Sequence, residues 1–122
     1  MLMRKLIEAI QMALRAAKVP PNVSAKVISH VESTFSEYGI NTLEELLKAP
    51  DWYLWLVLIK SLLSPITRML KSEGYCHANY YIVATLIAFD ERFNKFVREW
   101  VKSRCKAGLD PCCSNPKCCL VS

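Results

Sequence analysis

Hydrophobic residues recur three and four positions apart along most of the chain, and no stretch alternates with a period of two for long. The first predicted helix covers about residues 2–18 and ends before Pro20-Pro21, because the residue before a proline avoids helical geometry. A second helix follows, with Ser24 as its N-cap and Gly39 at its end. Residues 1–40 therefore predict two helices joined by a proline turn.

The middle of the chain predicts a short helix followed by a long one. Asn41-Thr42 with Glu45 forms a capping box that starts the short helix, which ends before Pro50. The long helix runs from Trp52 to Lys71, and Pro65 predicts a kink or break inside it.

The last two predicted helices cover about residues 79–89 and 91–106, the second with Asp90 as its N-cap and Gly108 after its end. The fold class is therefore all-α with short connections. We expect three parts: an N-terminal helical arm over residues 1–40, a compact helix bundle over residues 41–107, and a cysteine-rich, disulfide-stapled tail over residues 108–122. Six aromatic residues are assigned to the core and to subunit contacts: Trp52, Trp55, Phe89, Phe93, Phe96 and Trp100.

Composition excludes several classes of protein. The chain has 122 residues, of which 52% are hydrophobic and 22% charged, so it predicts one ordered domain. Only 3 glycines are present, and no Gly-rich phosphate-binding motif occurs, which excludes nucleotide-binding α/β folds. Cys76-His77 lacks a third orienting group, and the acidic pairs Glu44-Glu45 and Asp90-Glu91 lie at helix starts. We therefore expect a protein that is not an enzyme and needs no cofactor.

No targeting or membrane-spanning segment is predicted. The first residues are helix-patterned and interrupted by Glu8, Gln11 and Arg15, unlike a signal peptide. The most apolar stretch, Trp52 to Ile66, contains Lys60 and Pro65 and is shorter than the roughly 20 apolar residues of a spanning helix. It is interpreted as a buried core helix.

The net charge of +5 is unevenly distributed. Basic residues outnumber acidic ones in residues 1–30 and 90–122, whereas acidic residues dominate residues 31–60. Such asymmetry favours an anionic partner for the basic ends, or the acidic middle of a neighbouring copy.

The first helix carries a narrow polar stripe in which Arg4, Glu8, Gln11, Arg15 and Lys18 fall within about 80°. Two interpretations remain open: a solvated stripe on a bundle helix, or an arm that packs on other subunits and directs its cations at phosphates. Lys26 and His30 would extend the basic surface. The candidate phosphate contacts are Arg4, Lys5, Arg15, Lys18, Lys26 and His30. The cations of the last helix, Lys95, Arg98 and Lys102, are interpreted as a solubilising surface.

Six cysteines are the most distinctive chemistry of the chain: Cys76, Cys105, Cys112, Cys113, Cys118 and Cys119. Their vicinal pairs lack the usual C-x2-4-C spacing of zinc knuckles, so disulfides are favoured over a zinc site. The six thiols allow 15 pairings, and the sequence does not select one. Disulfides indicate an oxidising compartment or a hyperthermophilic source.

Three short motifs resemble a known family. Val19-Pro20-Pro21, then Glu37-Tyr38-Gly39-Ile40, then Tyr80-Tyr81-Ile82 before a last helix, resemble in order and spacing the major capsid proteins of rod-shaped and filamentous viruses of hyperthermophilic archaea. The likeness covers about residues 19–104, and the cysteine tail departs from it. The resemblance implies an all-helical subunit whose N-terminal arm wraps double-stranded DNA in the A form and whose C-terminal bundle forms the outer wall.

We therefore expect a structural capsid protein that coats linear double-stranded DNA without sequence specificity. It would assemble in the host cytoplasm into a helical virion, with or without a membrane envelope, from one protein or from two related ones. The alternatives are a small helical DNA-binding regulator, a secreted or membrane-surface disulfide-rich module, and a zinc module.

Overall fold

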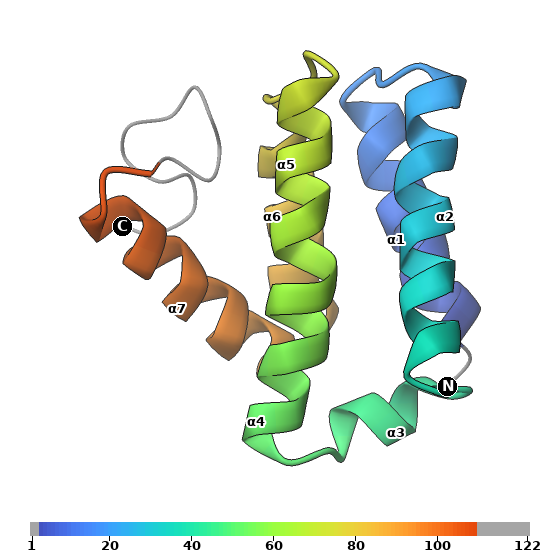
Figure 1. Ribbon diagram of the computed structural model, residues 1–122, viewed down its shortest axis with the longest axis vertical. Coiled ribbons are helices and arrows are strands. Elements are labelled where there is room, and N and C mark those ends of the chain that lie inside the picture. Colours follow the sequence, from blue (N-terminus) through green and yellow to red (C-terminus); the bar gives the residue numbers. More distant parts are fainter. Residues whose placement is uncertain (1–2, 110–122) are drawn as a thin grey trace.

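The computed structural model describes residues 3–109, and every regular element within that range is a helix (Figure 1). The all-α prediction is confirmed for this part of the chain. The elements are α1 (Met3–Ala16), α2 (Pro21–Glu37), α3 (Leu43–Leu47), α4 (Asp51–Leu54), η1 (Trp55–Leu63), α5 (Ser64–Ser72), α6 (Ala78–Phe89) and α7 (Glu91–Lys106).

Helix α1 ends in a Schellman motif. The N–H of Val19 donates to the carbonyl of Leu14 at 3.0 Å, and the N–H of Lys18 donates to the carbonyl of Arg15 at 2.9 Å. Lys18 lies between these bonds with a φ of 59°, in the left-handed region. The helix therefore ends two residues before the predicted limit, and the proline turn follows at once.

Helix α2 begins with a proline rather than with a serine cap. Pro20 is the N-cap residue and Pro21 is the first helical residue, where a missing N–H costs no helical hydrogen bond. The prediction of Ser24 as N-cap is wrong, because Ser24 lies inside the first turn and its hydroxyl is 3.5 Å from the carbonyl oxygen of Val19. The predicted end is confirmed, since Gly39 follows the helix with a φ of 66°.

The predicted capping box before α3 is not formed in its usual pattern, because Glu45 accepts from the residue before the N-cap. The backbone N–H of Asn41 donates to Glu45 Oε2 at 3.1 Å, whereas the N-cap residue Thr42 makes no side-chain cap bond. At α7 the predicted cap is complete, because Asp90 Oδ1 accepts from the backbone N–H of Arg92 at 2.9 Å.

Pro65 does not break the long helix. Residues 51–72 form one helical segment in which π-helical η1 lies between α4 and α5. Pro65 has no N–H for the carbonyl of Ser61, four residues earlier. His30 Nε2 of α2 lies 2.8 Å from that carbonyl oxygen and supplies it with a side-chain donor. The predicted break is therefore wrong: the helix continues through a π-helical segment before the proline, and a side chain from another helix bonds to that segment.

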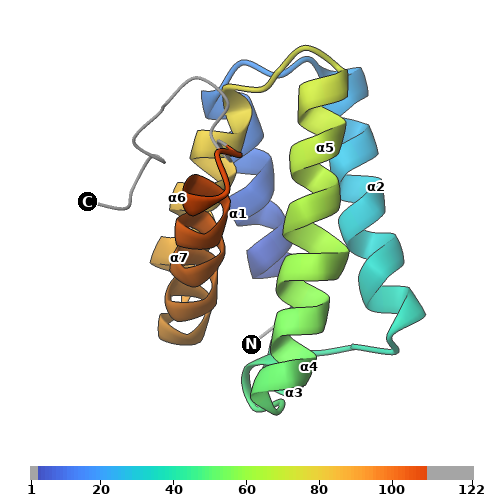
Figure 2. The ribbon, with the colours of Figure 1, turned by 60° about the vertical axis from the view of Figure 1, so that its left-hand side comes forward.

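Four helical segments close a ring around the core. Helix α1 packs against α2 and α6, α2 packs against η1 and α5, and α5 packs against α6. Helix α7 lies along α6 outside the ring, as Figure 2 shows, and also contacts η1. Asn79 of α6 is fully buried, and its Oδ1 lies 2.8 Å from the hydroxyl of Thr67 of α5. The described residues therefore share one continuous core.

The apolar face of α1 is buried within the same chain. Leu6, Ile10 and Leu14 are at most 2% exposed and belong to the common core. Of the two interpretations left open for this helix, the structure fits the bundle helix, because α6 and α2 of the same chain cover its apolar face.

Most of the aromatic residues assigned to the core are covered. Phe93, Phe96 and Trp100 are buried, and Trp55 and Phe89 are half-buried. Trp52 is 69% exposed and lies outside the core, although its ring meets that of Tyr53 edge-on at 5.6 Å.

The segment Asp51–Ser72 is long and apolar enough to cross a membrane by length and composition alone. Half of its most apolar window is buried inside the bundle, as in the core helix of a globular domain. This burial fits the sequence-based interpretation of a core helix.

Candidate nucleic-acid interface

The predicted phosphate contacts of α1 lie at its two ends. Arg4 and Lys5 are exposed in its first turn, and Arg15 and Lys18 are exposed at its other end. Eleven residues of helix separate Arg4 from Arg15, about 16 Å along the axis. The stripe is therefore solvent-exposed as predicted, but its cations form two groups and not one row.

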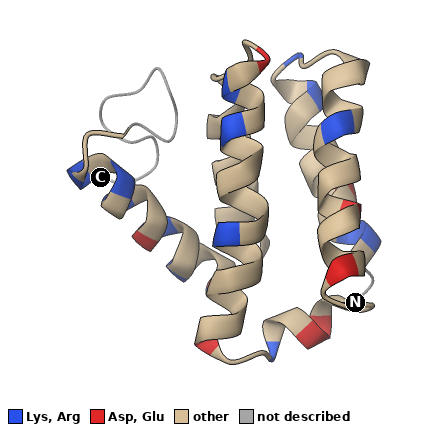
Figure 3. Cartoon of the chain, viewed as in Figure 1, with Lys and Arg blue, Asp and Glu red and all other residues tan. Residues whose placement is uncertain are grey.

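The second group belongs to a larger basic surface, the basic end, made of Arg15, Lys18, Lys26, Arg68 and Lys71. These residues come from α1, α2 and α5 and from the turn after α1. Figure 3 shows Lys and Arg of these helices gathered at the end of the bundle where the α1–α2 and α5–α6 connections lie. Residues 15–26 and 68–79 contain one acidic residue, Glu73. The basic end therefore carries a clear excess of positive charge.

Lys26 is partly neutralised within the basic end. Its Nζ lies 2.8 Å from Glu73 Oε1, and the two side chains are 56% and 30% exposed. An ion pair this exposed contributes at most about 1 kcal/mol to stability. The pair links α2 to the α5–α6 connection, while Lys26 remains accessible at the surface.

His77 fastens the two connections of the basic end together. Its Nε2 lies 3.0 Å from the carbonyl oxygen of Ala17, which follows the last turn of α1. Because a carbonyl only accepts, the ring nitrogen donates this bond. The bond fixes the α5–α6 connection beside Lys18 and satisfies a carbonyl that the helix end leaves open.

The remaining candidate, His30, has a packing contact. It is half-buried, and its Nε2 donates to the carbonyl of Ser61 in η1 at 2.8 Å. Tyr38, the C-cap residue of the same helix, forms a 2.8 Å hydrogen bond with the Ser61 hydroxyl. Both side chains therefore join α2 to η1, and we place His30 with the packing residues.

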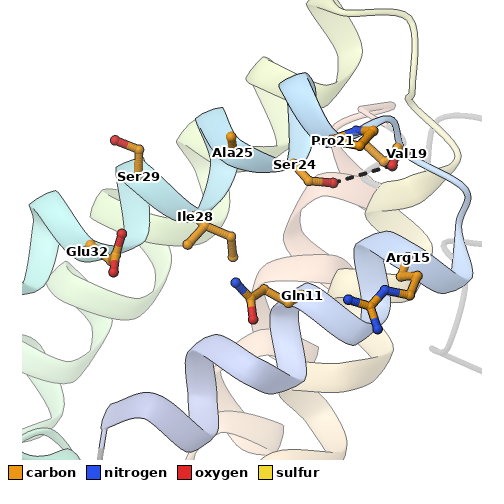
Figure 4. Close-up of a pocket in the computed structure, with 9 residues that line it drawn as sticks. All are labelled: Gln11, Arg15, Val19, Pro21, Ser24, Ala25, Ile28, Ser29 and Glu32. Atoms are coloured by element: carbon orange, nitrogen blue, oxygen red, sulfur yellow. Dashed lines mark hydrogen bonds between the residues drawn. The ribbon is translucent and has the colours of Figure 1, made fainter.

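A groove of about 560 Å³ opens between α1 and α2 beside the basic end (Figure 4). Gln11 and Ile28 approach each other across it, Arg15 lies toward the α1–α2 turn, and Glu32 lies at the other end. The lining thus offers one cation, one carboxylate and several hydroxyl and amide groups. The carboxylate disfavours phosphate at the Glu32 end of this groove, so the exposed end around Arg15 is the better phosphate site.

Two cysteines lie within the described residues, and both Cys76 and Cys105 are disulfide-bonded. The other candidates, Cys112, Cys113, Cys118 and Cys119, lie outside the described residues. Because Cys76 has no free thiol, the Cys76-His77 pair cannot act as nucleophile and base. Residues 3–109 contain no group of three or more His, Cys, Asp or Glu side chains placed to hold a metal ion.

The cations of α7 have local partners. The guanidinium of Arg104 lies 5.5 Å from the ring centroid of Trp100, and Arg98 Nε donates to Asn94 Oδ1 at 2.7 Å. Arg92 donates to the carbonyl of Leu47 and to Asp51 Oδ1, which joins the start of α7 to α3 and α4. These contacts give several of the α7 cations structural roles.

Arg68 and Lys71 are members of the basic end that sequence reasoning missed. They sit on the last turns of the long helix, 50 or more positions after Lys18 in the chain. Only the topology could have predicted them: in a bundle of antiparallel neighbours, the C-terminal ends of α1 and α5 can lie at the same end of the bundle.

No protein-family model, curated protein or solved structure matches the chain.

Proposed function

We propose that this protein is a non-enzymatic structural protein that coats linear double-stranded DNA without reading its sequence. The observation that carries the proposal is the basic end, where Arg15, Lys18, Arg68 and Lys71 accompany the ion-paired Lys26. Long exposed cations from several helices suit phosphate contacts, which supply sequence-independent affinity. Lys18 supports the proposal further. It occupies a left-handed backbone position that glycine would adopt without strain, and strained positions of this kind often serve a function.

The viral setting of the proposal comes from the resemblance to archaeal capsid proteins. Under it, the chain is a major capsid subunit of a filamentous virion, assembled in the host cytoplasm around A-form DNA. Its partners are double-stranded DNA and further copies of itself or of a related subunit. The disulfides at Cys76 and Cys105 are in keeping with a particle that must survive heat.

DNA binding is tested by titrating two unrelated duplexes with the protein at several salt concentrations, using fluorescence anisotropy. The double variant Arg15→Ala, Lys18→Ala should weaken binding equally on both duplexes and reduce the salt slope by about 1.8, the equivalent of two phosphate contacts. The control is Lys48→Ala, Lys60→Ala, which removes the same charge from exposed residues outside the basic end. Equal effects of the two double variants would contradict the proposed site.

The coat function requires a filament in addition to binding. Electron microscopy of the protein with long linear DNA should show continuous filaments, and nuclease digestion should leave the DNA protected along its length. A DNA-binding regulator would instead protect one short site and prefer it over bulk DNA by a factor of about a thousand or more. A membrane-surface module would need the apolar face of α1, which the core occupies.

A further inference from the structure

An uncharged groove runs between α1 and α6 on the outer surface of the bundle, where the two helices pack against each other. It has a volume of about 460 Å³ and is lined by alanines, together with Met12 of α1 and Tyr81 and Phe89 of α6. Its polar side-chain groups are the hydroxyls of Thr85 and Tyr81. The groove is therefore an apolar surface open to solvent between two helices of the bundle.

Met12 is the exposed centre of this surface. Its side chain is 68% exposed although it is apolar, and Tyr81 across the groove is 38% exposed. Methionine is flexible and fits irregular apolar sites, so a protruding methionine beside a groove lined by alanines makes a projection and a recess of matching chemistry. An exposed apolar side chain beside an apolar recess suits contact with another apolar surface.

We propose that the α1–α6 groove binds the same groove of a second copy, with the two α1 helices antiparallel about a two-fold axis near Met12. In such a pairing, Met12 of each copy enters the recess of the other. The contact is self-complementary, as a two-fold interface requires.

The charges beside Met12 select the antiparallel arrangement. Glu8 and Arg15 are both exposed and flank Met12, four residues before it and three residues after it. Antiparallel helices bring each Glu8 toward the partner's Arg15, twice across the axis. Parallel helices would pair Glu8 with Glu8 and Arg15 with Arg15, and like charges in direct apposition are unfavourable.

The dimer would also join two basic ends into one surface. Lys18 lies six residues after Met12, about 9 Å along the helix direction, so each copy brings its basic end close to the two-fold axis. This consequence for DNA rests on the proposed function, whereas the dimer itself does not.

Sedimentation equilibrium of the full chain without DNA tests the dimer. The unmodified protein should show a reversible monomer–dimer equilibrium, and Ala88→Glu should raise the dissociation constant about tenfold or more by placing a charge in the groove. The matched control is Ala25→Glu, on an exposed position of α2 outside the groove, which should leave the constant unchanged.

A charge exchange tests the orientation. Glu8→Arg and Arg15→Glu should each weaken the dimer, and the double variant should restore it because the opposite charges then meet again. A monomer at all concentrations, equal effects of Ala88→Glu and Ala25→Glu, or no recovery in the double variant would overturn the proposal. If the protein is monomeric but still binds both duplexes, the dimer fails and the DNA-binding function survives.

Discussion

Lys18 occupies a backbone position that glycine fills at three other helix ends. Gly39, Gly74 and Gly108 have φ values of 66°, 86° and 73°, and Lys18 has 59°. Each is followed by a residue whose N–H closes the same six-residue bond, as Ile40 does to Phe35 at 2.9 Å. A side chain in this region costs about 1 kcal/mol relative to glycine, so the chain carries a lysine where stability alone favours glycine.

Two substitutions of Lys18 should distinguish the effect of its charge from the effect of its backbone strain. Lys18→Gly should raise the free energy of unfolding by about 1 kcal/mol, because glycine adopts the left-handed conformation without a Cβ clash. Lys18→Ala removes the same charge but keeps the Cβ, so it should not stabilise the protein. Urea denaturation measures both.

The two variants should agree in DNA binding. Both lose one cation of the basic end, so anisotropy titrations should give equally weakened binding. If Lys18→Gly were no more stable than Lys18→Ala, the strain argument would fail, whatever the affinities.

The long helix is held by contacts from α2 and from the C-cap residue of α2. The carbonyl of Ser61 loses its usual donor to Pro65 and accepts from His30, and the Ser61 hydroxyl meets Tyr38. Both bonds lie on the π-helical segment η1. The irregular segment is thus held where α2 crosses it, and a buried carbonyl without such a donor is costly.

His30→Ala should therefore lower the free energy of unfolding by about 1–3 kcal/mol, since it leaves the half-buried Ser61 carbonyl without the donor that replaces Pro65. Thermal and urea unfolding measure the loss. The control is Ser33→Ala, at an exposed position of the same helix, which should change stability little. The folded His30→Ala variant should bind DNA with unchanged affinity. A marked loss of affinity would indicate that His30 contacts phosphate and is not only a packing residue.

Local chemistry predicts element boundaries well where one residue decides them. Asp90 caps α7 and Gly39 ends α2, because an Asx cap and a left-handed glycine act through the nearest backbone groups. The prediction of Ser24 as N-cap fails because Pro21 can occupy the first helical position, so the helix starts earlier. Local sequence does not predict the π-helical segment, because the side chain that bonds to it, His30, is distant in sequence.

Helix packing sorts many of the charged residues to opposite ends of the bundle. Arg15, Lys18, Arg68 and Lys71 share one end, whereas Glu37, Glu44, Glu45 and Asp51 lie at the α2–α3–α4 end, where the first turn of α1 also places Arg4 and Lys5. The sequence alone shows basic and acidic blocks, but it assigns the acidic block to the middle of the chain. Only the antiparallel arrangement of α2 and the long helix turns that middle into an end of the molecule.

The same packing explains what sequence reasoning about α1 could and could not predict. Periodicity correctly separates its apolar face from the stripe that holds Arg15 and Lys18, because that division follows from helix geometry. Periodicity does not identify the surface that covers the apolar face. Helix α6 covers it in this chain, since α6 is apolar around most of its circumference and can pack against α1 and α7 together.

The disulfides at Cys76 and Cys105 should contribute much of the stability of this small bundle. Cys76 lies in the α5–α6 connection beside His77, and Cys105 lies in the last turn of α7. Each bond that closes a loop is worth about 2–4 kcal/mol, mainly because it restricts the unfolded chain. Reduction should therefore lower the unfolding temperature by about 10 °C or more, as measured by scanning calorimetry with and without a phosphine reductant.

Reduction breaks every disulfide of the protein. The double variant Cys76→Ser, Cys105→Ser, studied without reductant, removes only the disulfides of the two cysteines in the described part of the chain. It should show most of the loss that reduction causes, because it removes the disulfides formed by Cys76 and Cys105. Superimposable unfolding curves for the oxidised protein and the double variant would contradict the prediction. Because His77 holds the carbonyl of Ala17 from the residue next to Cys76, the variant should also weaken DNA binding at the basic end, even at temperatures where the bundle remains folded.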